Sequence, residues 1–153
     1  MDGNGVYQDL AGNFAIMYAL SLRTTHSMAR KITYWVSTVL VAVPSFFAAF
    51  AYLSGSPQAV QGFAHVGYPQ QLRIILGIAK PLGGIVLLVP GVVRIKEWAY
   101  AGFAIAWICA FIAHRLAGDG SIAFAPLVSL VLLVISYLTR PANRQFPVQA
   151  TRS

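Results

Sequence analysis

Four uninterrupted apolar stretches, each about long enough to cross a lipid bilayer, constrain the fold of this chain more than any other feature. They cover residues 32–53, 72–89, 98–114 and 122–138. A transmembrane helix needs about 20 predominantly apolar residues, and about 17 are adequate. The stretches are continuous rather than alternating, and an open sheet edge cannot be satisfied in lipid, which argues against a sheet. The sequence therefore predicts an all-α, integral membrane four-helix bundle, formed by a single domain at residues 32–141.

The charged residues agree with this prediction and also indicate an orientation. Only 10% of the residues are charged, which is too few to cover the surface of a soluble domain. The net charge of +7 is spread over the connections instead of one basic arm, so we expect no nucleic acid as a partner. Cytoplasmic connections of membrane proteins are enriched in Lys and Arg, which predicts that both termini are cytoplasmic. Eight of the eleven Lys and Arg residues lie on that side: Arg23, Arg30, Lys31, Arg94, Lys96, Arg140, Arg144 and Arg152.

Lys80 is the one charged residue inside the apolar run 74–93. A lysine at bilayer depth costs roughly 2.5 to 3.5 kcal/mol, so it marks a protein interior or a functional site. Helical spacing places Lys80 on one face with Gly77 and Gly84, and small residues line contacts between membrane helices. We therefore expect Lys80 to face protein, either in a binding site or as a structural donor to carbonyls freed near Pro81.

The connection between spans one and two, residues 54–71, contains no Lys, Arg, Asp or Glu. Within it, Val60, Phe63 and Val66 recur at helical spacing. A short helix with one apolar face lies stably in the plane of a membrane surface. We therefore predict a short outer interfacial helix between spans one and two.

Span three carries a stripe of small residues that recur every three or four positions. Such a stripe permits close approach of two helices, which predicts tight packing between spans two and three. The single cysteine, Cys109, lies in the same span, cannot form an intramolecular disulfide and is expected to be a small buried apolar residue. The stripe consists of Ala99, Gly102, Ala106, Ala110, Ala113 and Ala117.

The chain outside the four spans is expected to play a smaller part. Residues 1–31 form an N-terminal extension whose apolar part, 10–22, is too short for a span, so we expect an interfacial helix or disorder. Alternatively, synthesis starts at Met28, which opens a basic lead-in to span one. Residues 142–153 are expected to form a flexible cytoplasmic tail. Lys96 and Glu97 lie in the inner connection, where an exposed pair has little energetic weight.

Four polar residues form a candidate pocket in this topology. His65 lies on the outer connection, His114 at the outer end of span three, Lys80 in the outer half of span two, and Tyr52 at the end of span one. Together with Arg115 and Asp119, we expect them to form a polar pocket that is open to the outside. The alternatives are a structural lysine and an interfacial histidine. Haem ligation by two histidines would need both rings to face one cavity, and no cluster has the spacing of metal ligands, so we expect no metal.

Three sequence blocks resemble the DoxX-like family of small bacterial membrane proteins. They are Phe63-Ala-His65-Val-Gly67-Tyr68-Pro69, then Leu76-Gly77-Ile-Ala-Lys80, and then Lys96-Glu97-Trp98-Ala-Tyr100-Ala-Gly102. The resemblance extends over about residues 32–141. It implies a four-helix transmembrane bundle in the bacterial inner membrane, and it implies that His65, Lys80 and Glu97 belong to the family pattern. The wider superfamily includes a subunit of a thiosulfate:quinone oxidoreductase and components of membrane redox complexes.

Two functions from different classes follow as hypotheses. In the first, the chain is an accessory subunit that binds a membrane-protein partner or a lipophilic small molecule, with a quinone as the candidate, near Lys80. In the second, it is a small quinone-linked membrane oxidoreductase with its site near the same lysine. A homo-oligomer is a further alternative to a different partner. The four acidic residues of the chain provide little material for acid-base hydrolysis.

Overall fold

The computed structural model describes residues 3–141 and 144–145 of the 153-residue chain. This part of the chain is helical and contains no strand, which confirms the predicted all-α class. The elements in chain order are α1 (Gly3–Leu53), α2 (Pro57–His65), α3 (Gln70–Leu88), α4 (Val93–Leu116), the 3-10 helix η1 (Gly120–Phe124) and α5 (Ala125–Thr139).

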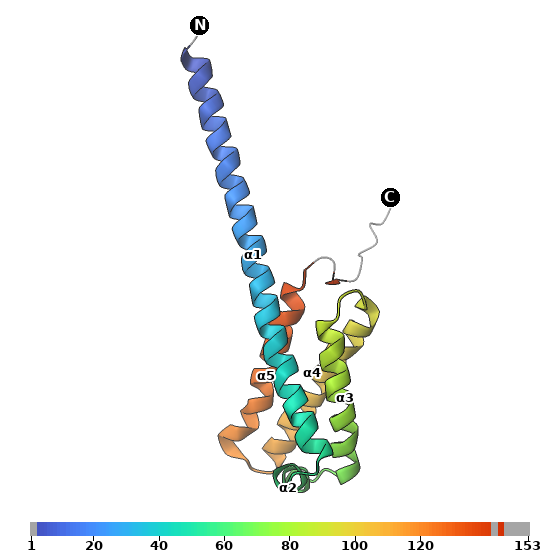
Figure 1. Cartoon of the computed structure of the whole chain (residues 1–153). Helices are drawn as coiled ribbons and strands as arrows, with labels where there is room; N and C mark the ends of the chain where they lie inside the picture. Colours follow the sequence, from blue (N-terminus) through green and yellow to red (C-terminus); the bar gives the residue numbers. More distant parts are fainter. Residues whose placement is uncertain (1–2, 142–143, 146–153) are drawn as a thin grey trace, which may run out of the picture.

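Within the described residues, four helical segments are long and apolar enough to cross a membrane. They are Ser27–Leu53, Gln70–Leu88, Val93–Leu116 and Gly120–Thr139, so each expected span is present and slightly longer than predicted. The four pack side by side as a bundle, with α1 against α3 and α5, and α4 against α3 and α5 (Figure 1). The predicted four-helix membrane bundle is confirmed. The short helix in the first connection is α2, which lies across one end of the bundle.

The two ends of the bundle differ in composition. One end, called the α2 end below, carries α2 and η1. The other, called the tail end, carries the α3–α4 connection together with Arg140, Arg144 and Gln145 (Figure 1). The predicted flexible tail begins at residue 142. Of it, Arg144 and Gln145 are described and are held by hydrogen bonds, and the remainder lies outside the described residues.

Helix α1 is continuous from Gly3 to Leu53, so residues 3–31 extend span one rather than form a separate element. The sequence explains this continuity, because residues 13–43 contain neither glycine nor proline and nothing there interrupts a helix. The first half of α1 projects beyond the bundle on the side of the tail end (Figure 1). Further along α1, Ser45 Oγ donates to the carbonyl of Val41 at 2.7 Å, next to Pro44.

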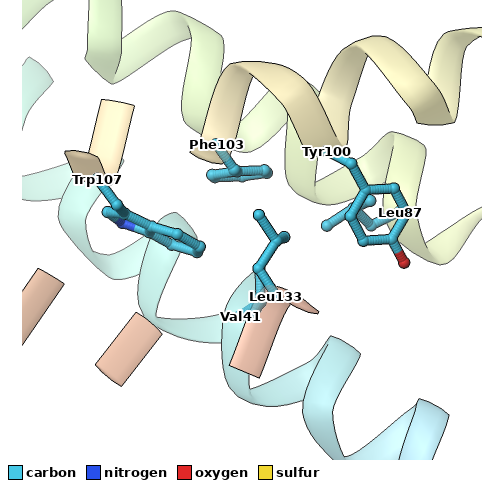
Figure 2. Packing of buried hydrophobic residues seen from close by; sticks show 6 residues of the cluster. All are labelled: Val41, Leu87, Tyr100, Phe103, Trp107 and Leu133. Atoms are coloured by element: carbon cyan, nitrogen blue, oxygen red, sulfur yellow. The ribbon is translucent and has the colours of Figure 1, made fainter. Parts of the chain in front are cut away.

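The buried core lies between the four spans and is aromatic on the α4 side. Figure 2 shows six residues that form this core. The rings of Phe103 and Trp107 are stacked, and their centroids lie 5.2 Å apart. In a membrane, such packing stabilises a bundle mainly through van der Waals contact, since lipid tails are as apolar as leucine. The outward faces of all four spans carry exposed aliphatic and aromatic side chains, as a surface in contact with lipid requires. The core residues are Val41, Leu87, Tyr100, Phe103, Trp107 and Leu133.

The glycines of α3 set how closely its neighbours approach. A Cβ added at Gly84 would lie 3.2 Å from the Phe46 ring of α1, and one added at Gly83 would lie 2.8 Å from the Phe103 ring of α4. Larger residues at these positions would require a ring to move. The small face of α3 therefore packs against α1, and Gly83 fits under the core ring of α4.

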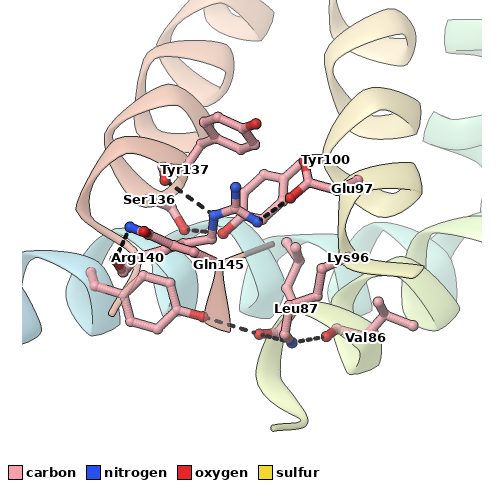
Figure 3. Close-up of polar contacts among 10 residues, drawn as sticks. Val86, Leu87, Lys96, Glu97, Tyr100, Ser136, Tyr137, Arg140 and Gln145 are labelled. Atoms are coloured by element: carbon pink, nitrogen blue, oxygen red, sulfur yellow. Dashed lines mark hydrogen bonds and ion pairs between the residues drawn. The ribbon is translucent and has the colours of Figure 1, made fainter. Parts of the chain in front are cut away.

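A buried polar cluster closes the tail end (Figure 3). Lys96 has an exposed fraction of 0% and its Nζ donates to the carbonyls of Val86, Leu87 and Val89. The last carbonyls of a helix have no partner within it, and they form the negative end of the helix dipole. Lys96 therefore caps the C-terminal end of α3, and the expectation of an exposed residue at this position was wrong. The reason is that the short α3–α4 connection folds the first turn of α4 back over the end of α3.

Arginines complete the same cluster. Arg140 Nη1 donates to Glu97 Oε1 at 2.7 Å, and its guanidinium lies 4.0 Å from the centre of the Tyr137 ring. Arg144 Nη1 donates to the Tyr34 hydroxyl at 3.1 Å and to the Leu88 carbonyl at 3.1 Å. The pair of Glu97 with Arg140 is therefore part of a mostly buried network that joins α1, α3, α4 and the end of α5, and not an exposed surface pair.

Candidate functional site

A cavity of about 650 Å³ lies at the α2 end of the bundle, among α1, α2, α3 and α4. Tyr52 from the end of α1 and Phe63 from α2 border it, and their rings meet edge to face at 5.1 Å. Trp107 reaches it from the core. Its walls are mostly apolar, and the polar side chains among them are few.

The small residues of α4 line this cavity instead of a tight helix contact. Gly102, Ala106, Ala110 and Ala113 face it, and a Cβ added at Gly102 would meet no atom within 4 Å. The expectation that spans two and three pack tightly along this stripe was wrong for these positions. Small residues permit close approach without enforcing it, and here the rings of Tyr52, Phe63 and Trp107 border a space that stays open.

Lys80 lies in the wall that α3 contributes. Its Nζ lies 3.4 Å from the Tyr52 hydroxyl and 4.9 Å from the centre of that ring. An ammonium group has three donors. Across the described residues, this long contact is the one hydrogen bond that Lys80 makes. The lysine therefore faces protein and cavity, as expected, and it keeps donors available for a ligand.

Asp119 joins two histidines at the α2 end of the bundle, and one of them, His114, lines the cavity. Its Oδ1 lies 2.6 Å from His65 Nε2, and its Oδ2 lies 2.5 Å from His114 Nδ1. The hydrogen bond from His114, and then the one from His65, hold the pKa of Asp119 below its ordinary value of 3.8. The carboxylate form accepts hydrogen bonds and does not donate them, so both histidines donate to it.

The backbone brings Asp119 to this position. Gly118 has a φ of 83°, a left-handed conformation that suits glycine and turns the chain after α4. The Asp119 amide then donates to the His114 carbonyl at 3.2 Å. The carboxylate thus lies beside the imidazole that precedes it by five residues.

The structure brings together three of the four predicted pocket residues. Lys80, Tyr52 and His114 line the cavity, whereas His65 is the exposed end of the Asp119 cluster, with 55% of its side chain exposed against 33% for His114. With one histidine in the cavity wall and both bonded to Asp119, the geometry does not fit haem ligation by a pair of imidazoles. Arg115 points elsewhere, with its guanidinium 5.9 Å from the Phe124 ring centre.

Three wall residues were not anticipated as part of the site. Cys109 is exposed rather than buried, because the side of α4 that carries it faces the cavity and not a neighbouring helix. The Tyr68 hydroxyl donates to the Cys109 carbonyl at 3.1 Å, and desolvation by burial, with a smaller effect of Cys109, raises the Tyr68 pKa. Trp107 is the third. It directly follows Ala106 of the α4 small stripe, and no pattern in the sequence distinguished it from an ordinary core residue.

The cavity also reaches the side of the bundle. Ile105 and Cys109 are exposed and lie within the α4 span, and both line the cavity. The cavity therefore borders the outward side of the α4 span near Ile105. Mostly apolar walls with a few polar groups are typical of a site for a small molecule, and the volume is in the usual range of about 300 to 1,000 Å³.

Comparison with known proteins gives one match. A model of the DoxX-like family matches residues 36–136, from the first half of the α1 span to the end of the buried part of α5. No curated protein and no solved structure matches the chain significantly.

Proposed function

The chain belongs to the DoxX-like family of membrane proteins, and from this premise we propose that it binds a lipophilic ring compound, a quinone or a close relative, in the cavity beside Lys80. In this proposal the chain acts as an accessory membrane subunit that holds the ligand. The observation that carries the proposal is the difference between two lysines of the span helices, Lys80 of α3 and Lys96 of α4.

Lys96 and Lys80 both lie in apolar spans, yet only Lys96 has its donors satisfied by protein. Three carbonyls accept from Lys96, whereas Lys80 has a single contact of 3.4 Å and borders an open cavity. A cation at this depth is costly without partners. A ligand carbonyl oxygen would supply the missing acceptor, which is the reason for placing a ligand there.

The walls suit an aromatic or quinonoid ring. Trp107, Phe63 and Tyr52 present aromatic surface, and such rings pack favourably face to face or edge to face. In this proposal a ligand that is dissolved in the bilayer enters beside Ile105, an exposed residue of the α4 span that lines the cavity. An alkyl tail could remain in lipid while the ring occupies the cavity.

The test measures the binding of a short-chain ubiquinone to the purified protein in lipid nanodiscs. Quenching of tryptophan fluorescence reports the binding. We expect Lys80→Met to raise the dissociation constant about tenfold or more, since a hydrogen bond to a charged donor contributes about 1.5 to 3 kcal/mol. Lys31→Met, which removes an exposed lysine far from the cavity, is the matched control and should bind as wild type does.

Equal affinity of wild type and Lys80→Met would overturn the proposed site. Solvent extraction of the purified protein, with mass spectrometry, provides an independent check for a ligand that co-purifies. A bound redox cofactor that disappears in both Lys80→Met and Lys80→Ala would assign the chain to the oxidoreductase class. An empty protein that retains a defined membrane partner would instead support the accessory role without a ligand.

We further propose that the protein lies in the bacterial inner membrane with the tail end in the cytoplasm. The support is the excess of Lys and Arg at that end. Fusion of a fluorescent protein after Ser153 should give fluorescent cells, and fusion of alkaline phosphatase at the same point should be inactive. Active phosphatase there would reverse the proposed orientation and place the α2 end of the bundle, with its cavity, on the cytoplasmic side.

A further inference from the structure

His114 has one nitrogen engaged by Asp119 and its ring in the cavity wall. Its Nδ1 lies 2.5 Å from Asp119 Oδ2, and the ring is one of the residues that line the cavity. Because the carboxylate only accepts, the proton of a neutral His114 is on Nδ1 and the lone pair is on Nε2. In the described part of the chain, no protein hydrogen bond is made by Nε2.

We propose that His114 is the residue that exchanges a proton with the ligand, and that the ligand is a ring compound with an ionisable hydroxyl, such as a hydroxyquinone or a hydroquinone. This inference rests on the proposed cavity site and adds the chemical class of the ligand. A plain quinone accepts from Lys80 but offers no proton to His114. A ligand with a ring hydroxyl accepts a hydrogen bond from Lys80 and also offers a proton to His114.

The exchange is a simple proton transfer. The O–H bond of the ligand breaks, an N–H bond forms at His114 Nε2, and the ligand oxygen keeps the electron pair as an oxyanion. The ammonium of Lys80 lies in the part of the cavity wall that α3 contributes, and in this proposal it stabilises the negative charge. The imidazolium is stabilised by the carboxylate of Asp119, which already accepts its Nδ1 proton.

Asp119 and His65 act here as positioning residues. Asp119 fixes the tautomer and the ring orientation of His114, in the same way that a carboxylate orients a general base. His65 donates to the second oxygen of Asp119 at 2.6 Å and keeps that carboxylate in place from α2. The lowered pKa of Asp119 agrees with a carboxylate that stays ionised while it holds two imidazoles.

Two charged side chains surround His114 in the described part of the chain. Lys80 carries a positive charge in the same cavity wall, and Asp119 carries a negative charge next to the imidazole. Arg115 follows His114 in the chain and stacks on Phe124. Among the described residues, the titratable and charged groups that border the cavity are Tyr52 of α1, Tyr68 of the α2–α3 connection, Lys80 of α3 and Cys109 of α4. Asp119 contacts His114, and His65 of α2 contacts Asp119.

Proton uptake on binding tests this inference, with 2-hydroxy-1,4-naphthoquinone and its 2-methoxy analogue as probes. Calorimetric titrations of the protein in nanodiscs, in two buffers of different ionisation enthalpy, measure the protons taken up per bound probe. At about pH 8 the free hydroxy probe is an anion and an ordinary histidine is neutral. We expect the wild type to take up about one proton with the hydroxy probe and none with the methoxy probe.

In His114→Gln the uptake should disappear, and the hydroxy probe should bind about tenfold more weakly because its charged partner is lost. The affinity for the methoxy probe should change much less. Arg115→Gln, beside His114 but outside the cavity, should keep the full uptake. Asp119→Asn should reduce the uptake, since the imidazolium loses its carboxylate.

The two proposals fail in different ways. If neither probe binds to wild type, the cavity site itself is wrong. If both probes bind to wild type without proton uptake, the site stands and the role of His114 is wrong. This comparison uses the wild-type protein alone, so it decides the matter even where the His114→Gln protein does not fold.

Discussion

Two lysines within the apolar spans differ in what surrounds their ammonium groups. Lys96 is fully buried, and its contacts to Val86, Leu87 and Val89 cap α3. Lys80 is partly buried and has one long contact to Tyr52. The first lysine therefore contributes to stability, and the second is available for binding.

The expected consequence is a difference in the free energy of unfolding. Lys96→Met keeps the aliphatic stem but removes the side-chain donor to the Val86 and Val89 carbonyls, which should lower the free energy of unfolding by about 3 kcal/mol. Lys80→Met should stay within about 1 kcal/mol of wild type, because little is lost with a long contact. Unfolding in mixed micelles by dodecyl sulfate titration, followed by far-UV circular dichroism, measures both. Similar losses in the two variants would contradict these assignments.

The Asp119 cluster gives a pH dependence whose sign follows from the lowered pKa of Asp119. A carboxyl group with a lower pKa in the folded protein contributes stability above its ordinary value of 3.8 and loses that contribution as the pH falls through the folded value. The thermal stability of wild type should therefore exceed that of Asp119→Asn at about pH 5, and the two should converge toward about pH 2. A difference that persists undiminished at about pH 2 would rule out this explanation.

At the scale of the element, α3 and α4 use their glycines in opposite ways. Gly83 of α3 lies against the Phe103 ring, which is buried and stacked on Trp107. Gly102 of α4 has open space around its Cα. The same residue type thus allows close packing at one position and borders a cavity at the other.

Alanine substitution at the two glycines should separate these roles. Gly83→Ala would force the buried Phe103 ring to shift from its position against Trp107, and should lower the free energy of unfolding by about 2 kcal/mol. Gly102→Ala should leave it unchanged or raise it by up to about 1 kcal/mol, since alanine favours the helix. The same dodecyl sulfate titration compares them. Equal effects at Gly83 and Gly102 would show that the contact with Phe103 carries no packing energy.

At the scale of the whole molecule, Arg30 and Tyr34, which both follow Met28, connect α1 to the rest of the bundle. Arg30 Nη2 donates to the Arg140 carbonyl at 2.9 Å, and the Tyr34 hydroxyl donates to the Leu87 carbonyl at 3.3 Å. The part of α1 before these residues projects away from the bundle (Figure 1). We therefore expect the four spans to form their bundle without that part.

A chain that starts at Met28 should insert into the membrane and fold. We expect its membrane yield and its dodecyl sulfate unfolding midpoint to match those of the full chain, because the span that begins at Ser27 and its contacts are almost entirely retained. Membrane fractionation and the same unfolding titration measure both quantities. Loss of membrane insertion in the shortened chain would mean that the projecting helix is needed for folding.

Much of this fold follows from local sequence. The four spans were predicted within a few residues, because the length of an apolar run is a local property that the bilayer converts directly into a helix. Helical spacing also indicated that Lys80 faces protein, and the topology indicated that Tyr52 and His114 lie at the same end. The α2 helix followed from the spacing of Val60, Phe63 and Val66.

The remaining features depend on distances between helices, which no local pattern specifies. The small residues around Gly102 were compatible with a tight helix contact or with an empty space. The positions of the Tyr52, Phe63 and Trp107 rings in the folded protein leave a cavity there. Likewise, Lys96 caps α3 because the connection folds back, and Asp119 bridges two histidines because the turn at Gly118 brings it there. The sequence alone determined which segments cross the membrane, and the tertiary structure decided which polar groups are satisfied within the protein and which, like Lys80, remain available to a ligand.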